Sequence, residues 1–402
     1  MKKLLALTAV ALIGPSSAYT LHEWGTFTSV SGSDGVLLAG LNREEELLPR
    51  FVHAHDGMMN TGPMNFARKG FFAHRPLKKV TIKMETPVIY FYADEPFEAS
   101  VEVGFNGGSI NQWYPQRSSG ETVPKIVKAN PMPTDAQFKD AGGIDFSTPF
   151  QGNIKWDVDV LAPDASRGLS FKNGETLNWL RPRNSKANVL KVGEEYEDYL
   201  FYRGVGNFEL PVTFLVDPSE TLHIENTGKE ALPFLFVQEV TPDGKIRFHS
   251  FSDGLPAGST LSIPEKDLHT TDAKWRRLVY DQMAEGLLST GLTAEEAHGM
   301  IQTWWHSYFE QPGLRVFWVV PTDKTNEILP LTVNPAPEKT VRVLVGRSEV
   351  LRPRFEQQLV EAYKVREDKK KGAIWASNMF HRYGLAFQER VQTLSGEKIA
   401  KK

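Results

Sequence analysis

The chain has 402 residues, in which 46 lysines and arginines nearly balance 49 aspartates and glutamates, giving a formal charge of −3. Hydrophobic residues make up 41% and charged residues 24%, ordinary values for a globular protein that exclude a disordered chain. A protein with this near-neutral charge lacks the excess of basic residues that binds a phosphate backbone, so we expect no nucleic-acid partner. The absence of cysteine excludes disulfides, thiolate metal sites and a cysteine nucleophile.

The N-terminus has the features of a secretory signal peptide. Lys2 and Lys3 precede an apolar run over residues 4–14, and small residues follow up to Ala18. We expect cleavage after Ala18 and a periplasmic or secreted protein. No later segment has about 18 uninterrupted apolar residues, so we expect no membrane span.

Hydrophobic alternation predicts strands through the first two thirds of the chain. The strongest case is 154–160, where Ile154, Trp156, Val158 and Val160 alternate with charged residues. The turn sequence Asn106-Gly107-Gly108 predicts a hairpin between runs 99–105 and 111–114. Further strands are expected at 80–84, 87–92, 208–216, 221–225, 232–240 and 245–251, and residues 120–149 are expected to form a long loop.

Helical spacing begins near Trp275. A second helix is expected to begin at Thr293, because Glu296 follows three residues later in a capping-box pattern. Strands return at 314–320 and 341–345, and one long last helix is expected from near Pro353.

These elements predict a mainly β protein of β-sandwich-like units, α+β overall, with a helical hairpin and a C-terminal helix. The expected regions are a signal peptide (1–18), an N-terminal β-rich region (19–165), a second β-rich region (166–267), a helical hairpin (268–311), and strands with a C-terminal helical region (312–402). The oligomeric state is left open.

Histidines near the mature N-terminus suggest a metal site. His53 and His55 project to one side of an extended segment, and His22 is expected to join them as a third ligand of one divalent transition metal, zinc or copper. Glu23 or Asp56 would orient an imidazole or serve as general base. Our leading functional hypothesis is therefore an exported metal-binding protein, and a metal-dependent hydrolase is one form that it could take.

Two other hypotheses remain open. The protein could be a non-catalytic envelope protein whose aromatic faces bind a small molecule or glycan, since it has 9 Trp, 11 Tyr and 24 Phe. Alternatively, the histidines could be purely structural. No nucleotide-binding G-x-G-x-x-G or P-loop motif and no G-x-S-x-G hydrolase elbow occurs.

The segment His22-Glu23-Trp24-Gly25-Thr26-Phe27-Thr28 resembles the opening of the mature chain in a group of exported bacterial proteins of unassigned activity. The segments LPRFVH (48–53), METPVIYFY (84–92), LFYRG (200–204) and TWWHSYF (303–309) are similar as well. The likeness therefore spans most of the mature chain. It implies export and a single architecture, and it carries over no catalytic residue.

Overall fold

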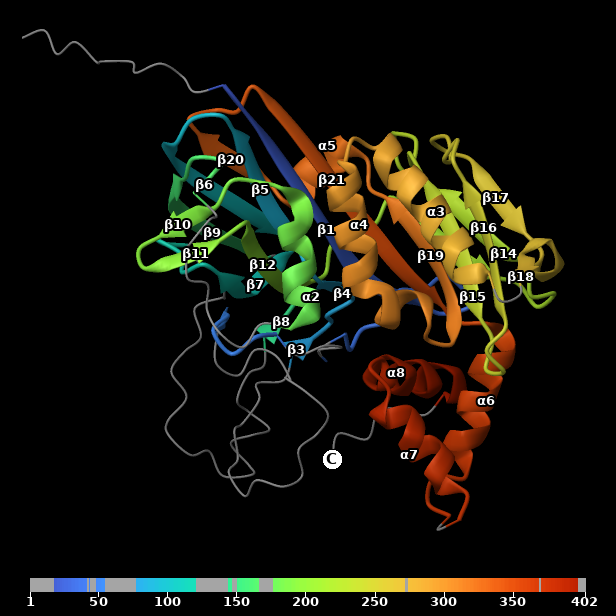
Figure 1. The fold of residues 1–402 in the computed structure, drawn as a ribbon. Coiled ribbons are helices and arrows are strands. Elements are labelled where there is room, and N and C mark those ends of the chain that lie inside the picture. Colours follow the sequence, from blue (N-terminus) through green and yellow to red (C-terminus); the bar gives the residue numbers. More distant parts are fainter. Residues whose placement is uncertain are drawn as a thin grey trace, which may run out of the picture.

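A computed structural model describes residues 18–41, 43, 48–54, 77–120, 144–146, 150–165, 176–271, 274–368 and 370–396 (Figure 1). Strand residues outnumber helical residues, 39% against 27%, and the predicted mainly β, α+β architecture is confirmed. Most of the long loop expected at 120–149 lies outside the described residues. No helix in the described part of the chain is long and apolar enough to span a membrane.

A large central sheet is built around two long parallel strands, β1 (Tyr19–Ser31) and β21 (Lys339–Val350). Nearly every residue of β1 is buried, which is the pattern of a strand covered on both faces. Beyond β1 lie β4 (Ile82–Met84), β5 (Val88–Ala93), β12 (Leu200–Gly206) and β7 (Gly108–Tyr114), whose outer side pairs with β2 (His53–Ala54). Beyond β21 lie β19 (Gly313–Val319), β15 (Leu235–Val240), β16 (Ile246–Phe251) and β18 (His269–Thr271).

Two smaller groups of strands cover one face of the central sheet. The first contains β6 (Phe97–Asn106), β9 (Gln151–Val160), β10 (Leu190–Val192), β11 (Glu195–Glu197) and β20 (Leu331–Asn334). The second is the three-stranded sheet of β13 (Val212–Val216), β14 (Leu222–Asn226) and β17 (Thr260–Ile263). Both share a single hydrophobic core with the central sheet, and β9 alternates between buried and more exposed residues as predicted. A short parallel pair, β3 (Leu77–Lys78) and β8 (Ile144–Asp145), is separate.

The predicted hairpin around Gly107 is wrong. Gly107 forms a turn with a positive φ of 79°, but β6 pairs with β9 and β20 whereas β7 pairs with β12. The turn therefore carries the chain from one layer to another. Strands from both expected β-rich regions also meet in the central sheet, because β12 pairs with β4, β5 and β7.

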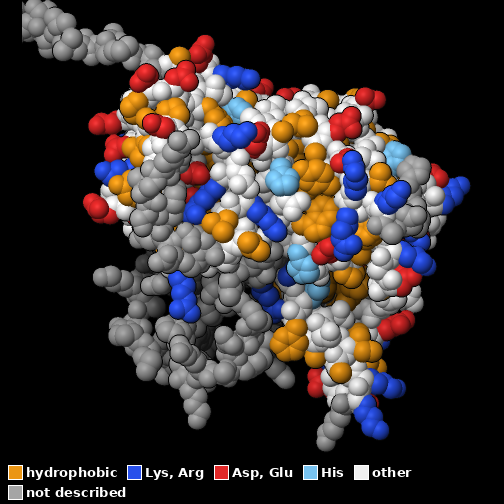
Figure 2. All heavy atoms as spheres, viewed as in Figure 1, with side chains coloured by type: hydrophobic (Ala, Val, Ile, Leu, Met, Phe, Trp, Pro, Cys, Tyr) orange, Lys and Arg blue, Asp and Glu red, His pale blue; other side chains and the backbone are white. Residues whose placement is uncertain are grey.

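Helices cover the opposite face of the central sheet, which we call the helix face (Figure 1). They are α2 (Leu177–Leu180), the 3₁₀ turn η1 (Arg181–Ser185), α3 (Trp275–Ser289), α4 (Ala294–Trp304) and a π-helical turn, η3 (Trp305–Phe309). The predicted capping box is present, because Thr293 and Glu296 bond reciprocally at the start of α4. Viewed from outside, hydrophobic, histidine and basic side chains lie interspersed over α3 and α4 (Figure 2).

The C-terminal region forms three helices instead of the predicted single one. They are α6 (Pro353–Lys364), α7 (Gly372–Phe380) and α8 (Gly384–Ser395), and they pack at one end of the sheet around a third hydrophobic cluster (Figure 1). The helix begins at Pro353 as predicted, but glycines open the two later helices. Among the described residues, the remaining short helices are η2 (Glu265–Asp267) and α5 (Thr322–Ile328).

Candidate functional site

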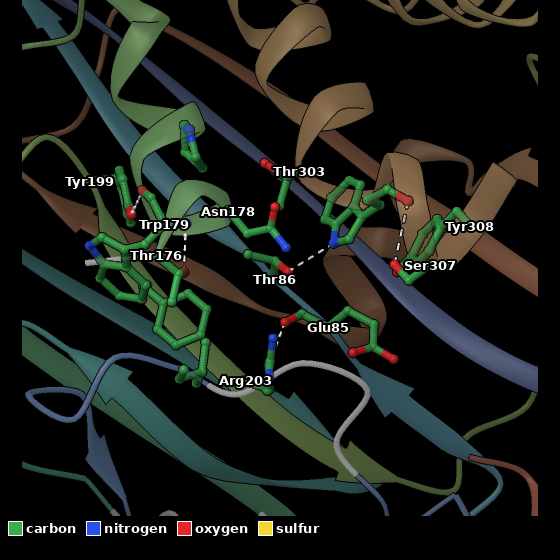
Figure 3. A pocket seen from close by; sticks show the side chains of 14 residues that line it. Glu85, Thr86, Thr176, Asn178, Trp179, Tyr199, Arg203, Thr303, Ser307 and Tyr308 are labelled. Atoms are coloured by element: carbon green, nitrogen blue, oxygen red, sulfur yellow. Dashed lines mark hydrogen bonds between the residues drawn. The ribbon is translucent and has the colours of Figure 1, made fainter. Parts of the chain in front are cut away.

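A small cavity lies where the helical layer meets the central sheet (Figure 3). Its lining comes from α2, α4, η3, β12 and the link between β4 and β5. The cavity has a volume of about 40 Å³, which is room for about three water molecules.

Five aromatic rings line this cavity: Trp179, Tyr199, Phe201, Trp304 and Tyr308. Trp304 and Tyr308 stack with their ring centres 5.2 Å apart and their planes 11° from parallel. Across the cavity, the Trp179 ring packs edge-on against Phe201 at 5.1 Å. Interlocked rings of this kind give a small-molecule site rigid apolar walls.

Polar groups from three elements reach the same space (Figure 3). The Nε of Arg203 on β12 donates a hydrogen bond to the carbonyl oxygen of Glu85 at 2.6 Å. The indole nitrogen of Trp304 donates to the hydroxyl of Thr86 at 3.3 Å, and the amide of Asn178 on α2 extends toward Thr86. The cavity thus combines aromatic walls with a guanidinium, an amide and a hydroxyl, which can orient a polar ligand.

A row of polar side chains continues from the cavity along the helix face. Lys83 of β4, Thr28 of β1 and Arg347 of β21 stand beside one another in register. Lys83 is 2% exposed and Arg347 is fully buried. The Lys83 Nζ lies 3.1 Å from one carboxylate oxygen of Glu85, and the Thr28 hydroxyl donates to the other at 3.0 Å. Glu85 therefore joins this row to the cavity.

Three arginines surround one carboxylate, Glu349, farther along the same face. The distances to its Oε1 are 3.1 Å from Nε of Arg315, 3.4 Å from Nε of Arg347 and 3.3 Å from Nη2 of Arg382. Tyr308 links this group to the cavity, because the guanidinium carbon of Arg347 lies 4.0 Å from the centre of its ring.

We define the cationic band as Lys83, Arg203, Arg315, Arg347 and Arg382 together with Glu85 and Glu349. Among the described residues, it sets five cationic groups against two carboxylates. Burial lowers the pKa of the Arg315 guanidinium, and the positive charges of Arg382 and Arg347 act in the same direction, whereas Glu349 opposes them. The band is therefore a buried region in which several cationic side chains lie close to one another.

The structure places His22 and Glu23 on opposite faces of β1, as strand alternation predicts. The Nδ1 of His22 lies 2.9 and 3.0 Å from the carboxylate oxygens of Glu296 in the first turn of α4. On the other face, the Glu23 carboxylate accepts hydrogen bonds from the Tyr202 hydroxyl at 2.7 Å and from Nε of Arg342 at 2.6 Å. Glu23 is thus part of a buried ion pair and does not approach His22.

His53 lies in a different part of the sheet. Its Nε2 is 3.1 Å from both carboxylate oxygens of Glu195, and its ring stacks on Trp113 with centres 6.4 Å apart. Strands β7, β12 and β5 separate it from His22, a span of roughly 19 Å at about 4.8 Å per strand. The structure therefore does not bring these two histidines together.

The remaining predicted residues, His55 and Asp56, lie outside the described residues, so their roles stay predictions. Within the ranges that the structure describes, no group of three or more His, Asp or Glu side chains is placed to hold a metal ion.

Sequence analysis did not single out the cationic band, although a signal for it exists. Lys83 interrupts a hydrophobic strand, and Arg347 falls within the strand-forming run that ends at Val350. A charged side chain at an inward-facing strand position is unusual, because charged groups are rarely buried unless they are paired. The sequence could not show that these distant residues meet, because their meeting depends on the order of the strands.

Comparison with known proteins gives no guide to this site. No family model matches the chain, and no curated protein is significantly similar to it. The geometry of the site is therefore the basis for assigning a function.

Proposed function

We propose that the protein binds a small polar molecule in the cavity beside α2 and α4. The observation that carries this proposal is the convergence of five aromatic rings with Arg203, Asn178 and Thr86 on one space. Rigid rings supply apolar contact area at a low cost in side-chain entropy, and a few fixed polar groups set the ligand's orientation.

The size of the cavity limits what enters it. About 40 Å³ accommodates a group as large as about three water molecules, such as a carboxylate, a phosphate or a hydroxymethyl group. A whole hexose would need more space. The part of the ligand that is recognised here is therefore a compact polar group.

We further propose that binding takes place outside the cytoplasm. The signal-peptide features of residues 1–18, together with the resemblance to exported bacterial proteins, support export. N-terminal sequencing of protein from a periplasmic fraction or culture medium should give Tyr19 as the first residue. An intact Met1 on protein confined to the cytoplasm would contradict export.

Ligand binding can be tested with a panel of small molecules, because Trp179 and Trp304 line the cavity and report occupancy by fluorescence. The panel contains acetate, acetamide, phosphate, glycerol and glucose, the last because aromatic faces also suit sugars. Thermal denaturation gives a second readout, since a ligand that binds only the folded state raises the melting temperature.

Two matched variants decide whether binding occurs at this site. Arg203→Met removes a buried guanidinium at the cavity, whereas Arg342→Met removes one that is paired with Glu23 on the opposite face. We expect the first to abolish binding of whichever probe the wild type binds, and the second to preserve it. No binding of any probe, or equal binding by both variants, would contradict the proposal.

A further inference from the structure

Three side chains on the outer face of the three-stranded sheet form a hydrogen-bonded chain. The Oγ of Ser262 on β17 lies 2.9 Å from Nδ1 of His223 on β14, and Nε2 of His223 lies 3.1 Å from Oδ2 of Asp217. These strands lie away from α2 and the cavity beside it (Figure 1). The three groups stand in the order that nucleophilic catalysis uses: a nucleophile, its base, and a group that orients the base.

The pairing of the strands brings the serine and the histidine together. His223 and Ser262 lie directly opposite each other in the ladder between β14 and β17. The backbone of His223 bonds to β13, whereas the residues on either side of it bond to β17, as the bond from Asn226 N to Ser259 O farther along shows. A pair of this non-hydrogen-bonded kind has the shortest distance between its side chains.

Asp217 is held by the turn that follows β13. Its Oδ1 accepts hydrogen bonds from the hydroxyl and backbone N–H of Ser219 at 2.7 and 2.8 Å and from the N–H of Thr221 at 3.0 Å. The Ser219 hydroxyl and then His223 lower the pKa of the Asp217 carboxyl. An ionised carboxylate only accepts, so a neutral His223 ring carries its proton on Nε2 and presents the Nδ1 lone pair to the Ser262 hydroxyl.

The serine lies at an open edge of the sheet. Among the described residues, no strand pairs with the side of β17 that faces away from β14. The backbone N–H of Ser262 points to that free edge, because its pair with His223 is non-hydrogen-bonded. The N–H of the nucleophile itself is a donor that can stabilise a tetrahedral oxyanion. The Ser262 residue is exposed, and the side chains of His223 and Asp217 are 31% and 32% exposed, so a substrate can reach all three groups.

We propose that these residues form a second site, which hydrolyses carboxylic esters with Ser262 as nucleophile, His223 as general base and Asp217 as positioning residue. The Ser262 Oγ bonds to the carbonyl carbon while its proton moves to Nδ1 of His223. The ester C–O bond then breaks, and the alcohol leaves with that proton. Water attacks the acyl-serine and gives a proton to His223, which returns it to the Ser262 Oγ as the acid departs. The site lies on an open face, which suits esters with small, unhindered acyl groups.

Diisopropyl fluorophosphate tests the nucleophile, because the serine oxygen bonds to phosphorus, fluoride leaves and the serine proton moves to the base. We expect mass spectrometry to find the label on Ser262 in the wild type and to find none in Ser262→Ala. His223→Gln should slow labelling, and the hydrolysis of 4-nitrophenyl acetate, at least about a hundredfold. Thr260→Ala is the matched control, since it removes an exposed hydroxyl from the same face of β17 and should leave both rates unchanged.

Asp217→Asn tests the positioning role by a spectroscopic signature. ¹⁵N NMR of the neutral His223 ring should place its proton on Nε2 in the wild type and on Nδ1 in the variant, which should be labelled at least about tenfold more slowly. Circular dichroism confirms that each variant is folded. No label on Ser262 in the wild type, an equal labelling rate in His223→Gln, or a wild-type ring protonated on Nδ1 would overturn the proposal. None of these results bears on binding at the cavity, which depends on other residues.

Discussion

Glu349 provides a quantitative test of the cationic band. Glu349→Gln preserves the size of the side chain and removes the only carboxylate that contacts Arg315, Arg347 and Arg382 among the described residues. Removing one partner of a buried ion pair costs about 3–5 kcal/mol, because the other charge stays buried without compensation. The glutamine oxygen can still accept a hydrogen bond, so we expect a loss of about 3 kcal/mol in the free energy of unfolding.

The loss converts into a measurable shift in melting temperature. The entropy of unfolding of a chain of this length is about 0.8 kcal/mol/K, so the variant should melt on the order of 4 °C below the wild type. Urea denaturation followed by circular dichroism gives the free energy directly.

A surface substitution serves as the control for this measurement. Glu327→Gln removes a carboxylate that is 67% exposed and lies 2.7 Å from Nζ of Lys324, and we expect it to change stability by no more than about 0.5 kcal/mol. If Glu349→Gln costs less than about 1 kcal/mol, the arginines do not depend on Glu349 for neutralisation. Other contacts of these arginines would then be sufficient to hold them in the sheet.

Three further predictions concern other parts of the molecule. Burial raises the pKa of Asp198 to about 7, so the folded state binds this proton more tightly than the unfolded state. The protein therefore loses stability as the pH rises from about 4 to about 7. Asp198→Asn should stabilise the protein at pH 8 and not at pH 4, and an equal gain in the free energy of unfolding by urea at both pH values would contradict this. Gly346→Ala would place a Cβ atom 2.4 Å from the Trp318 ring, and should cost about 1–3 kcal/mol, whereas an unchanged urea midpoint would show that the ring can move. The predicted metal site requires about one equivalent of zinc or copper by elemental analysis, lost in a His53→Ala/His55→Ala double variant; no stoichiometric metal after reconstitution would remove that hypothesis.

The sequence predicted those elements whose determinants lie within a few residues of one another. Thr293 and Glu296 mark the start of α4 because both partners of the capping box fall within one turn. Alternation over 154–160 predicted β9 because burial on one face is a property of the strand itself. The hairpin at Gly107 was wrong because a turn specifies a change of direction, whereas strand pairing depends on residues far along the chain.

The candidate site shows the same limit more strongly. Histidines and adjacent carboxylates stand out in a sequence, so His22, Glu23 and His53 were identified as one candidate group. Their positions in the sheet separate them, because β7, β12 and β5 come between β2 and β1 and because neighbouring residues of a strand face opposite sides. Neither Arg203 nor Arg347 belongs to a catalytic or ligand-binding motif, and only the assembled sheet places Arg203 at the cavity and Arg347 against Tyr308 beside it.

The apolar surroundings of the cationic band argue that stability alone does not explain it. On the helix face of β1, Trp24 packs into the cluster beneath the helices and Val30 into the cluster beneath α8, with Thr28 between them. Apolar residues at the neighbouring positions Lys83 and Arg347 would join the two clusters into one core. Replacing buried charged groups by well-packed apolar ones is often neutral or stabilising, so a fold that needed only stability would gain nothing from charges at this place. The buried charges therefore have a role that apolar residues could not fill, because they fix polar and ionised groups beside the cavity.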